Sequence, residues 1–312
     1  MEATNHDLLP DLRRDPCLVL ASDYGGEHKE SKYHVFAYLI ADRPGILRHW
    51  DHARKKIRRD FLGNQRRISY KTLGDGMKRR ALIPFLKAAN TINGLLFCVA
   101  FDKSVAPISP SIVWPNGMDV AARYEPFWKP KVWEKLIRVL MFGGVLVGGL
   151  SQPGQSLHWI TDDDEIIPND KCLPLACDMA GTVVGHYIEG PMELQLGIAG
   201  KFDDEYRAED LISIVDLAAG AVADAFTSFP DDTILVSKNL LVPSGASVTT
   251  KAKLIYAWLS YSMTPLKKIV CLASPIEGGL FHVRFGTPVY APNPRGLWLP
   301  PDKRWRNCAP KR

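Results

Sequence analysis

The chain has 312 residues, of which 46% are hydrophobic and 23% charged, with 24 Gly and 23 Pro. A chain of this length can build a full core, as one large domain with an extension or as two domains, and the composition excludes collagen, coiled-coil and disulfide-scaffold classes. We therefore expect a mixed α/β or α+β protein.

Charge is distributed unevenly along the chain. The formal net charge is +5, yet the segment from Arg48 to Lys87 holds thirteen Lys or Arg against three Asp. The rest of the chain is then net acidic, at −5. A local basic excess of this size favours a nucleic-acid-binding surface, with a solvated helical face as the alternative explanation.

The sequence predicts neither a membrane span nor a targeting segment. The longest apolar run, Val139 to Leu150, is shorter than the roughly 20 residues that a membrane helix needs. The first seven residues lack the basic and apolar parts of a signal peptide. The six cysteines show no zinc-ligand spacing, so we expect a cytoplasmic protein with reduced cysteines and no membrane partner.

The first predicted element is a short buried strand, Cys17 to Ser22, which ends at Asp23. Residues 33–41 are rich in aromatic and branched side chains and follow one short loop later. We expect these two segments to pair as an antiparallel hairpin. Residues 1–16 before them are expected to form a polar leader.

A basic helix is predicted next, over about residues 46–62, because apolar residues recur there at three- and four-residue spacing. That spacing leaves four basic residues for the opposite side of the helix: Arg54, Lys55, Arg58 and Arg59. Residues 66–73 are predicted to form another short strand, which carries Lys71. A helix over residues 77–92, interrupted or tightened by Pro84, follows it.

The middle of the chain predicts an alternation of strands and helices. Residues 95–101 are expected to form a buried strand that ends at Asp102, and residues 132–147 a helix. An irregular, proline-rich segment lies between them. A further strand over residues 157–161 leads into a run of four acids: Asp162, Asp163, Asp164 and Glu165.

The remaining elements of the main domain are a helix over residues 172–187, a strand over 192–198 and a helix over 209–226. We expect this domain to span residues 17–230. Residues 231–312 are expected to form a C-terminal extension, with a helix and a β-rich stretch. The extension ends in a basic arm rich in Pro and Trp, residues 291–312.

Three acids are candidates for one shared site. Asp23 and Asp162 each follow a predicted strand, and Asp216 lies beside the apolar surface of a helix rich in Ala and Gly. A buried carboxylate needs a partner or a metal. Clustered carboxylates repel one another unless divalent cations neutralise them, and two such cations about 4 Å apart can activate a water in phosphodiester hydrolysis.

Each of these acids also has a structural interpretation. Asp23 fits an Asx-turn at the hairpin, Asp162 a solvated acidic turn, and Asp216 a buried salt bridge or an acid at the helix surface. Lys71 fits a lysine on the surface of a strand. Asp102 also ends a strand and is a fallback ligand.

In this order of elements the chain resembles the RNase H-like proteins catalogued as domain of unknown function 3800. The resemblance covers about residues 17–226. It rests on Ala-Ser-Asp-Tyr-Gly-Gly at 21–26, Ile-Ser-Tyr-Lys at 68–71, Trp-Ile-Thr-Asp at 159–162 and Val-Asp-Leu-Ala-Ala-Gly at 215–220. It implies an α/β fold with a mixed sheet flanked by helices, followed here by a C-terminal α+β extension.

The resemblance further implies a metal-dependent nuclease-type site. In such a site Asp23, Asp162 and Asp216 would hold Mg²⁺ or Mn²⁺, and Lys71 would orient the scissile phosphate or the attacking water. The predicted reaction is hydrolysis of phosphodiester bonds in DNA or RNA.

The sequence departs from the family pattern at two positions. Tyr24 stands where the family often carries Glu, and Ser69 stands where a carboxylate frequently precedes the Lys. Each departure removes a potential metal ligand, for which Glu27, Asp75 or Asp163 are substitutes. The alternative function is therefore a catalytically inactive RNase H-like subunit that binds nucleic acid or serves in assembly.

The basic segment supplies the expected contacts to nucleic acid, since Lys and Arg contacts to phosphates are the main source of sequence-independent affinity. The predicted contacts are Arg54, Lys55, Arg58, Arg59, Arg66, Arg67, Lys78, Arg79 and Arg80. The C-terminal arm is the expected binding segment for a protein partner.

Overall fold

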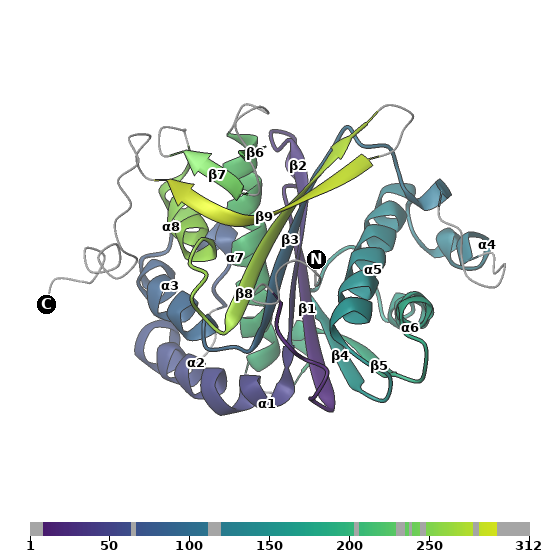
Figure 1. The fold of residues 1–312 in the computed structure, drawn as a ribbon, viewed down its shortest axis with the longest axis horizontal. Helices are drawn as coiled ribbons and strands as arrows, with labels where there is room; N and C mark the ends of the chain where they lie inside the picture. Colours follow the sequence, from purple (N-terminus) through teal and green to yellow (C-terminus); the bar gives the residue numbers. More distant parts are fainter. Residues whose placement is uncertain are drawn as a thin grey trace, which may run out of the picture.

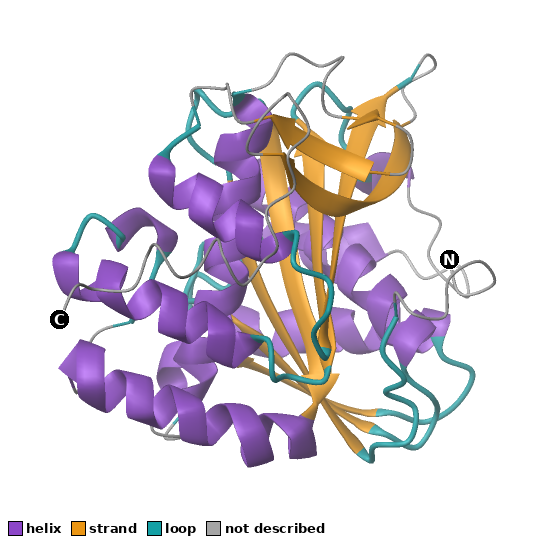
Figure 2. Ribbon diagram, turned by 60° about the vertical axis from the view of Figure 1, so that its left-hand side comes forward, coloured by secondary structure: helices purple, strands orange, loops and turns teal. Residues whose placement is uncertain are grey.

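The computed structural model describes residues 9–63, 67–111, 120–202, 206–228, 235–236, 239–243, 248–276 and 281–291. Arg66 and the C-terminal arm after residue 291 lie outside these residues, so the predictions made for them are not addressed by the structure. The described residues form one mixed β-sheet with helices on both faces (Figures 1 and 2).

The sheet has the strand order β5-β4-β1-β2-β3-β8-β9-β7-β6. Its strands are β1 (Cys17–Gly25), β2 (Tyr33–Asp42), β3 (Gly94–Asp102), β4 (Ser156–Thr161), β5 (Glu193–Ile198), β6 (Leu235–Val236), β7 (Asn239–Pro243), β8 (Leu266–Pro275) and β9 (Phe281–Ala291). Strand β2 is antiparallel to both β1 and β3, whereas β4 runs parallel to β1 and β5 parallel to β4. The predicted hairpin between the first two strands is confirmed.

Helices cover the two faces in separate groups (Figure 1). The helices are α1 (Arg43–Gly45), α2 (Asp51–Ile57), α3 (Gly76–Ala89), α4 (Val120–Tyr124), α5 (Pro130–Leu150), α6 (Cys172–Tyr187), α7 (Arg207–Thr227) and α8 (Thr250–Leu259). Helices α2, α3, α7 and α8 lie on one face, and α5 and α6 lie on the other. Among the described residues, no helix has the length and apolar character needed to cross a membrane.

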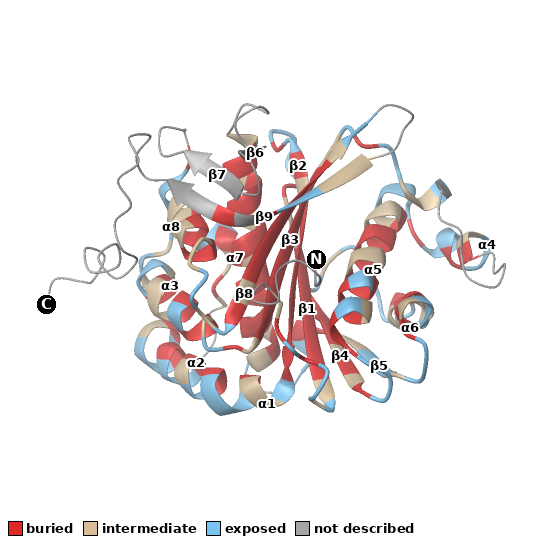
Figure 3. Ribbon diagram, in the orientation of Figure 1, coloured by how far each residue is buried: buried red, intermediate tan, exposed pale blue. Residues whose placement is uncertain are grey.

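Strand β1 shows how the sheet separates the two cores. Successive side chains of a strand point to opposite faces. Val19 and Ala21 therefore pack in the core beneath α7, while Leu18 and Leu20 pack in the core beneath α5 and α6. The central strands are buried along most of their length (Figure 3), so their positions are fixed by packing on both faces.

Helix α7 approaches β1 closely because both elements carry small residues where they meet. A Cβ atom added to Gly25 would lie 3.1 Å from the backbone carbon of Ala219. On the same helix, a Cβ atom added to Gly220 would lie 2.3 Å from Cγ of Tyr70. The run of Ala and Gly in α7 therefore allows the helix to lie directly over the end of β1.

The predicted strand over residues 66–73 is wrong. The described part of it is irregular up to Ser69, and residues Tyr70–Thr72 form a single 3-10 turn. The N–H of Tyr70 donates to the carboxylate of Asp216, and the Ser69 and Thr72 hydroxyls bond each other. Because these local and side-chain bonds satisfy the backbone polar groups, the segment does not join a strand.

The basic helix is confirmed, but two of its arginines do not face solvent. Helical structure runs from Arg43 to Leu62, with π-helical turns over Ile46–Trp50 and Arg58–Leu62. Arg54 is fully buried and Arg58 is 7% exposed. The prediction that these two residues contact nucleic acid is therefore wrong.

A buried carboxylate on α7 explains why the two arginines turn inward. Arg58 Nε and Nη2 donate to the two oxygens of Asp210 at 2.6 and 2.7 Å, and Arg54 Nη1 donates to the same carboxylate at 3.2 Å. Arg54 Nε also donates to Asp51 at 2.7 Å. A carboxylate as buried as Asp210 is costly without such partners. This network joins the basic helix to α7.

The C-terminal extension continues the main sheet. Strand β8 pairs in parallel with β3 over Gly94–Phe101, and β9 returns antiparallel to β8. Helix α8 packs against α7 through residues of the same core, including Trp258 and Phe226. Helix α8 thus lies in the same helical layer as α7, while β8 and β9 extend the sheet.

We predict that Arg58→Met lowers the free energy of unfolding by about 3 kcal/mol, the lower end of the cost of breaking a buried ion pair, because Arg54 still faces Asp210. The matched control is Arg59→Met. Arg59 is 74% exposed, so its substitution should change stability by less than about 0.5 kcal/mol. Urea unfolding of both variants measures the difference, and equal stabilities would contradict a structural role for Arg58.

Candidate carboxylate site

The structure brings the three predicted acids to the same end of the sheet, although their oxygens do not all lie within 4.8 Å of one another. Strands β1 and β4 are parallel and in register, with Ser22 opposite Thr161, so Asp23 and Asp162 come next to each other at the same end of the sheet. Asp216 lies on α7, which covers this end of β1. Asp23 lies inside β1, opposite Ala37 of β2, and therefore does not cap the hairpin as an Asx-turn.

Burial and mutual repulsion raise the pKa values of two of these acids. Asp23 is only 6% exposed, and its pKa is raised well above the usual range, first by burial and then by the charges of Asp216 and Asp162. Burial also raises the pKa of Asp216 to about 6, and the charge of Asp162 contributes. The charge of Asp162 therefore disfavours ionisation of both Asp23 and Asp216.

One arginine lies among the three acids. Arg67 Nη1 donates to Asp162 Oδ1 at 2.6 Å, and Arg67 Nη2 lies 3.5 Å from Asp23 Oδ2. Its Nε is buried and has no hydrogen-bond partner among the described residues. Arg67, expected on a nucleic-acid-binding surface, is thus paired inside the acidic site, and its single charge does not balance three carboxylates.

Asp216 is held by a backbone group. Its Oδ2 accepts a hydrogen bond of 2.5 Å from the N–H of Tyr70, which lowers its pKa but does not offset the effect of burial. In the part of the chain that the structure describes, no cationic side chain lies within 4.0 Å of this carboxylate. The predicted alternative of a buried salt bridge at Asp216 therefore does not apply.

Lys71 does not join the acids. It lies on the 3-10 turn of residues 70–72, its side chain is exposed, and it has no hydrogen-bond or ion-pair partner among the described residues. A different lysine lies on the Asp216 side of the site. Lys251, in the first turn of α8, donates to the carbonyl oxygen of Tyr70 at 3.1 Å, and its charge lowers the pKa of Asp216.

Sequence reasoning missed Tyr70 and Lys251 as parts of the site, although Tyr70 lies within the Ile-Ser-Tyr-Lys segment. Tyr70 contributes its backbone and its ring, and neither depends on a recognisable motif. Lys251 lies in the C-terminal extension, outside the expected main domain that contains Asp216. Only the packing of α8 on α7 brings Lys251 close to the acidic site. No spacing rule connects these positions.

The two departures from the family pattern lie outside the acidic site. Because neighbouring strand residues point to opposite faces, Tyr24 extends away from Asp23 and shares hydrogen bonds with Ser22 and Thr161. Ser69 bonds within its own turn. A carboxylate at position 24 would therefore lie on the other face of β1.

A second group of acids lies at the same end of the sheet. Glu27, Asp164 and Glu165 offer oxygens within 4.8 Å of one another, the one such set among the described residues. Lys135 lies between them, with Nζ 2.6 Å from Asp164, 3.5 Å from Glu165 and in contact with Glu27. This group already has a cation at its centre, so we interpret it as a structural ion-pair cluster.

The other acids weighed as ligands have local roles. Asp75 caps the start of α3 by accepting from the N–H groups of Met77 and Lys78. Asp102 accepts from Ser104 in the turn after β3. Asp163 is exposed beside Asp162. None of them points to the acidic site.

The basic surface that remains beside the site comes from two neighbouring helices. Lys55 and Arg59 are exposed on the helix of residues 43–62, and Arg79 and Arg80 are exposed on α3, which packs beside it (Figure 1). Lys78 donates to Thr72 at 2.8 Å in the turn near the site. These side chains lie on the same face of the sheet as α7.

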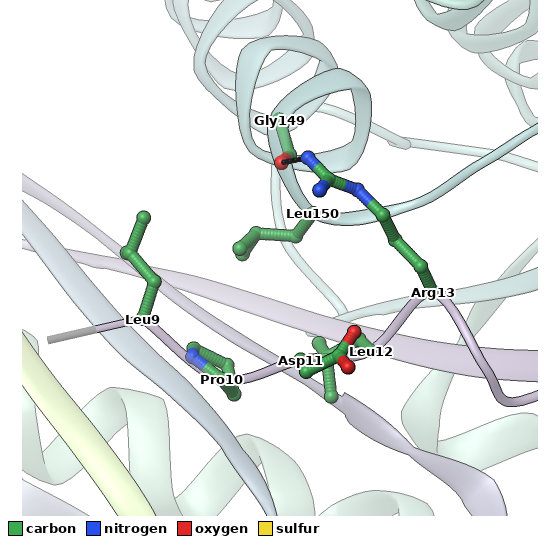
Figure 4. A pocket seen from close by; sticks show the side chains of 7 residues that line it. All are labelled: Leu9, Pro10, Asp11, Leu12, Arg13, Gly149 and Leu150. Carbon is green, nitrogen blue, oxygen red and sulfur yellow. Dashed lines mark hydrogen bonds between the residues drawn. The ribbon is translucent and has the colours of Figure 1, made fainter. Parts of the chain in front are cut away.

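A pocket of about 270 Å³ lies elsewhere (Figure 4). Residues 9–13 line it together with Gly149 and Leu150 at the end of α5, and Arg13 donates to the carbonyl oxygen of Gly149 at 3.1 Å. It belongs to the α5 face of the sheet, away from α7. Its residues take no part in the acidic site.

Comparisons with protein-family models, with curated proteins and with solved structures find no match to this chain. The functional argument therefore depends on the geometry of the site, in which three electrostatically coupled carboxylates are accompanied by one guanidinium and one ammonium group.

We predict that Asp216→Asn stabilises the metal-free protein at alkaline pH. In the natural chain the folded-state pKa of Asp216 is about 6, above the ordinary value of 3.8. Ionisation of Asp216 therefore lowers the free energy of unfolding of the natural chain as the pH rises from about 4 to about 6. By this linkage the variant gains about 3 kcal/mol at pH 8 and about half of that at pH 5.

Urea unfolding at both pH values in EDTA measures this difference, because Asn still accepts the Tyr70 hydrogen bond while it removes the charge. The matched control is Asp163→Asn, at an exposed acid, which should leave stability unchanged. A loss of stability for Asp216→Asn at pH 8 would instead identify Asp216 as a favourable structural ion.

Proposed function

We propose that this chain is an RNase H-like protein that hydrolyses phosphodiester bonds of DNA or RNA, using Mg²⁺ or Mn²⁺ held by Asp23, Asp162 and Asp216. The order of elements supports the fold assignment. A strand with Asp23, its hairpin partner, a basic helix, further strands, the acid after β4 and a final helix with Asp216 follow one another as the family resemblance requires.

The observation that carries the proposal is the excess of negative charge in the site. After burial, the charges of Asp216 and Asp162 raise the pKa of Asp23, and the charge of Asp162 raises that of Asp216. Arg67 is the one cation paired with these acids in the described chain. Carboxylate oxygens are the ligands that Mg²⁺ and Mn²⁺ prefer. The donor types therefore suit a hard divalent cation, which would relieve the repulsion between the acids. Because the three acids do not offer oxygens within 4.8 Å of one another in this structure, their side chains would have to move closer together to bind it.

The residues of the chain would have separate tasks in this reaction. A bound divalent cation supplies a water of lowered pKa and stabilises charge on the phosphate. Asp23, Asp162 and Asp216 would fix its position from strand β1, from the residue directly after β4 and from helix α7. Arg67, which pairs with Asp162 and Asp23, would be available to a phosphate oxygen once a cation binds these acids.

The exposed basic residues fit the binding of nucleic acid. Lys55, Arg59, Arg79 and Arg80 lie on two adjacent helices that flank the face carrying the acids. Phosphate contacts from such residues give affinity without sequence preference and make it dependent on salt. A nucleic-acid strand on these helices would place its backbone near the site.

The ion pairs of Arg67 favour a second candidate function. Arg67 donates a 2.6 Å hydrogen bond to Asp162. The charge of this carboxylate is therefore balanced by a side chain of the protein, without a metal ion. On this alternative the chain is an inactive RNase H-like subunit that binds nucleic acid or assembles with a protein partner, for example through its C-terminal arm.

We predict Mg²⁺- or Mn²⁺-dependent cleavage of labelled single- or double-stranded DNA or RNA, abolished by EDTA. Asp162→Asn should lower the rate by at least about 100-fold, the upper end of the cost of losing an outer-shell partner of a metal. Asp163→Asn, the neighbouring exposed acid, should keep full activity. Salt-sensitive binding without any cleavage would support the inactive subunit.

A further inference from the structure

The ammonium group of Lys251 is fixed at the edge of the carboxylate site. Lys251 Nζ donates to the carbonyl oxygen of Tyr70 at 3.1 Å and lies 3.8 Å from the centre of the Tyr70 ring. Such a cation–π contact restrains a flexible lysine side chain. The position of Lys251 therefore depends on that of Tyr70.

Tyr70 is in turn fixed to α7 through its N–H group, its ring and its hydroxyl. Its N–H donates to Asp216 at 2.5 Å, its ring packs on Gly220, and its hydroxyl donates to Asp224. A single residue thus holds Asp216 by its N–H group and Lys251 by its carbonyl oxygen. The two side chains are consequently neighbours.

The start of α8 is also anchored to α7. Thr249 caps the helix by accepting from the N–H of Ala252 at 3.3 Å, and its hydroxyl donates to Asp224 at 3.1 Å. Lys251 lies in the first turn after this cap. Its Cα position is thus set by the same acid that receives the hydroxyl of Tyr70.

The charge of Lys251 is not consumed by an ion pair. Over the described ranges of the chain, no carboxylate oxygen lies within 4.0 Å of its Nζ. Arg67 is paired with Asp162 and Asp23, and its charge, ahead of that of Lys251, also lowers the pKa of Asp216. Lys251 differs from Arg67 in that no acid among the described residues forms an ion pair with it.

Resting on the proposed function, we propose that Lys251, and not Lys71, is the lysine that binds the substrate phosphate at the carboxylate site. A phosphodiester carries a negative charge and is repelled by carboxylates, so a cation beside the acids is needed to hold it. Lysine is a common phosphate ligand, acting as a compact point charge. Lys251 meets this need from a fixed position, whereas Lys71 is exposed on a turn and makes no contact with the acids.

The assignment predicts effects of opposite sign on two ligands. Removing a positive charge beside the acids strengthens binding of a divalent cation and weakens binding of a phosphate. The test variant is Lys251→Met, with Lys251→Arg as the conservative variant. Lys253→Met is the matched control, because it removes the same charge two residues later on α8.

Two equilibrium measurements are made on the full chain. Mn²⁺ binding without nucleic acid is followed by calorimetry, and binding of short fluorescein-labelled DNA and RNA strands in Ca²⁺ is followed by anisotropy over a range of salt. We expect Lys251→Met to bind Mn²⁺ about fivefold more tightly, from the loss of one nearby like charge. We expect it to bind the strands about tenfold more weakly, with the salt slope reduced by about one.

Lys251→Arg should restore most of the strand affinity, and Lys253→Met should resemble the natural chain in both measurements. Unchanged binding of both ligands by Lys251→Met would overturn the proposal. Weaker binding of both would also overturn it, because that result indicates a structural role at the start of α8. Failure of the natural chain to bind either Mn²⁺ or the strands would overturn it as well.

Cleavage by the same proteins separates this proposal from the proposed function. If the natural chain cleaves no substrate but Lys251→Met shows the two opposite shifts, the hydrolytic function fails and the assignment of Lys251 stands. If the natural chain cleaves and Lys251→Met retains its KM and kcat, the function stands and the assignment fails.

Discussion

A buried carboxylate must find a counter-charge or enough hydrogen bonds, and α7 carries two carboxylates that satisfy this constraint differently. Asp210 receives two buried arginines, Arg54 and Arg58, and is a structural ion. Asp216, which is half-buried, receives one backbone N–H group and no ion pair from the described residues. Burial raises the pKa of both acids. Asp210 holds the basic helix against α7 through its ion pairs with Arg54 and Arg58. The negative charge of Asp216 has no such partner among the described residues.

The basic residues likewise fall into two groups, those paired with acids inside the protein and those exposed on its surface. Arginines that face α7 are buried in the core or paired in the acidic site, so the exposed basic surface is smaller than the count of basic residues suggests. What remains exposed is concentrated on the outer sides of two neighbouring helices.

The carboxylate site combines elements from both ends of the chain. The sheet supplies Asp23 and Asp162, α7 supplies Asp216, and the segment after the basic helix supplies Arg67 and Tyr70. Helix α8, from the C-terminal extension, supplies Lys251. The extension thus lies within the functional arrangement, because it shares the core that positions α7 and continues the sheet beside β3.

The sequence by itself determined the regular elements and the acids that end them. Apolar periodicity and β-branched runs are local signals, so the hairpin of β1 and β2 and the full extent of α6 followed from them. The parallel pairing that places Asp162 beside Asp23 fits the same alternation of strands and helices. Tertiary structure alone decided which charges are buried. Arg58 meets Asp210 across 152 residues, and the packing of α8 on α7 brings Lys251 to the carbonyl oxygen of Tyr70, because the partners of a charge depend on distant packing that no local spacing encodes.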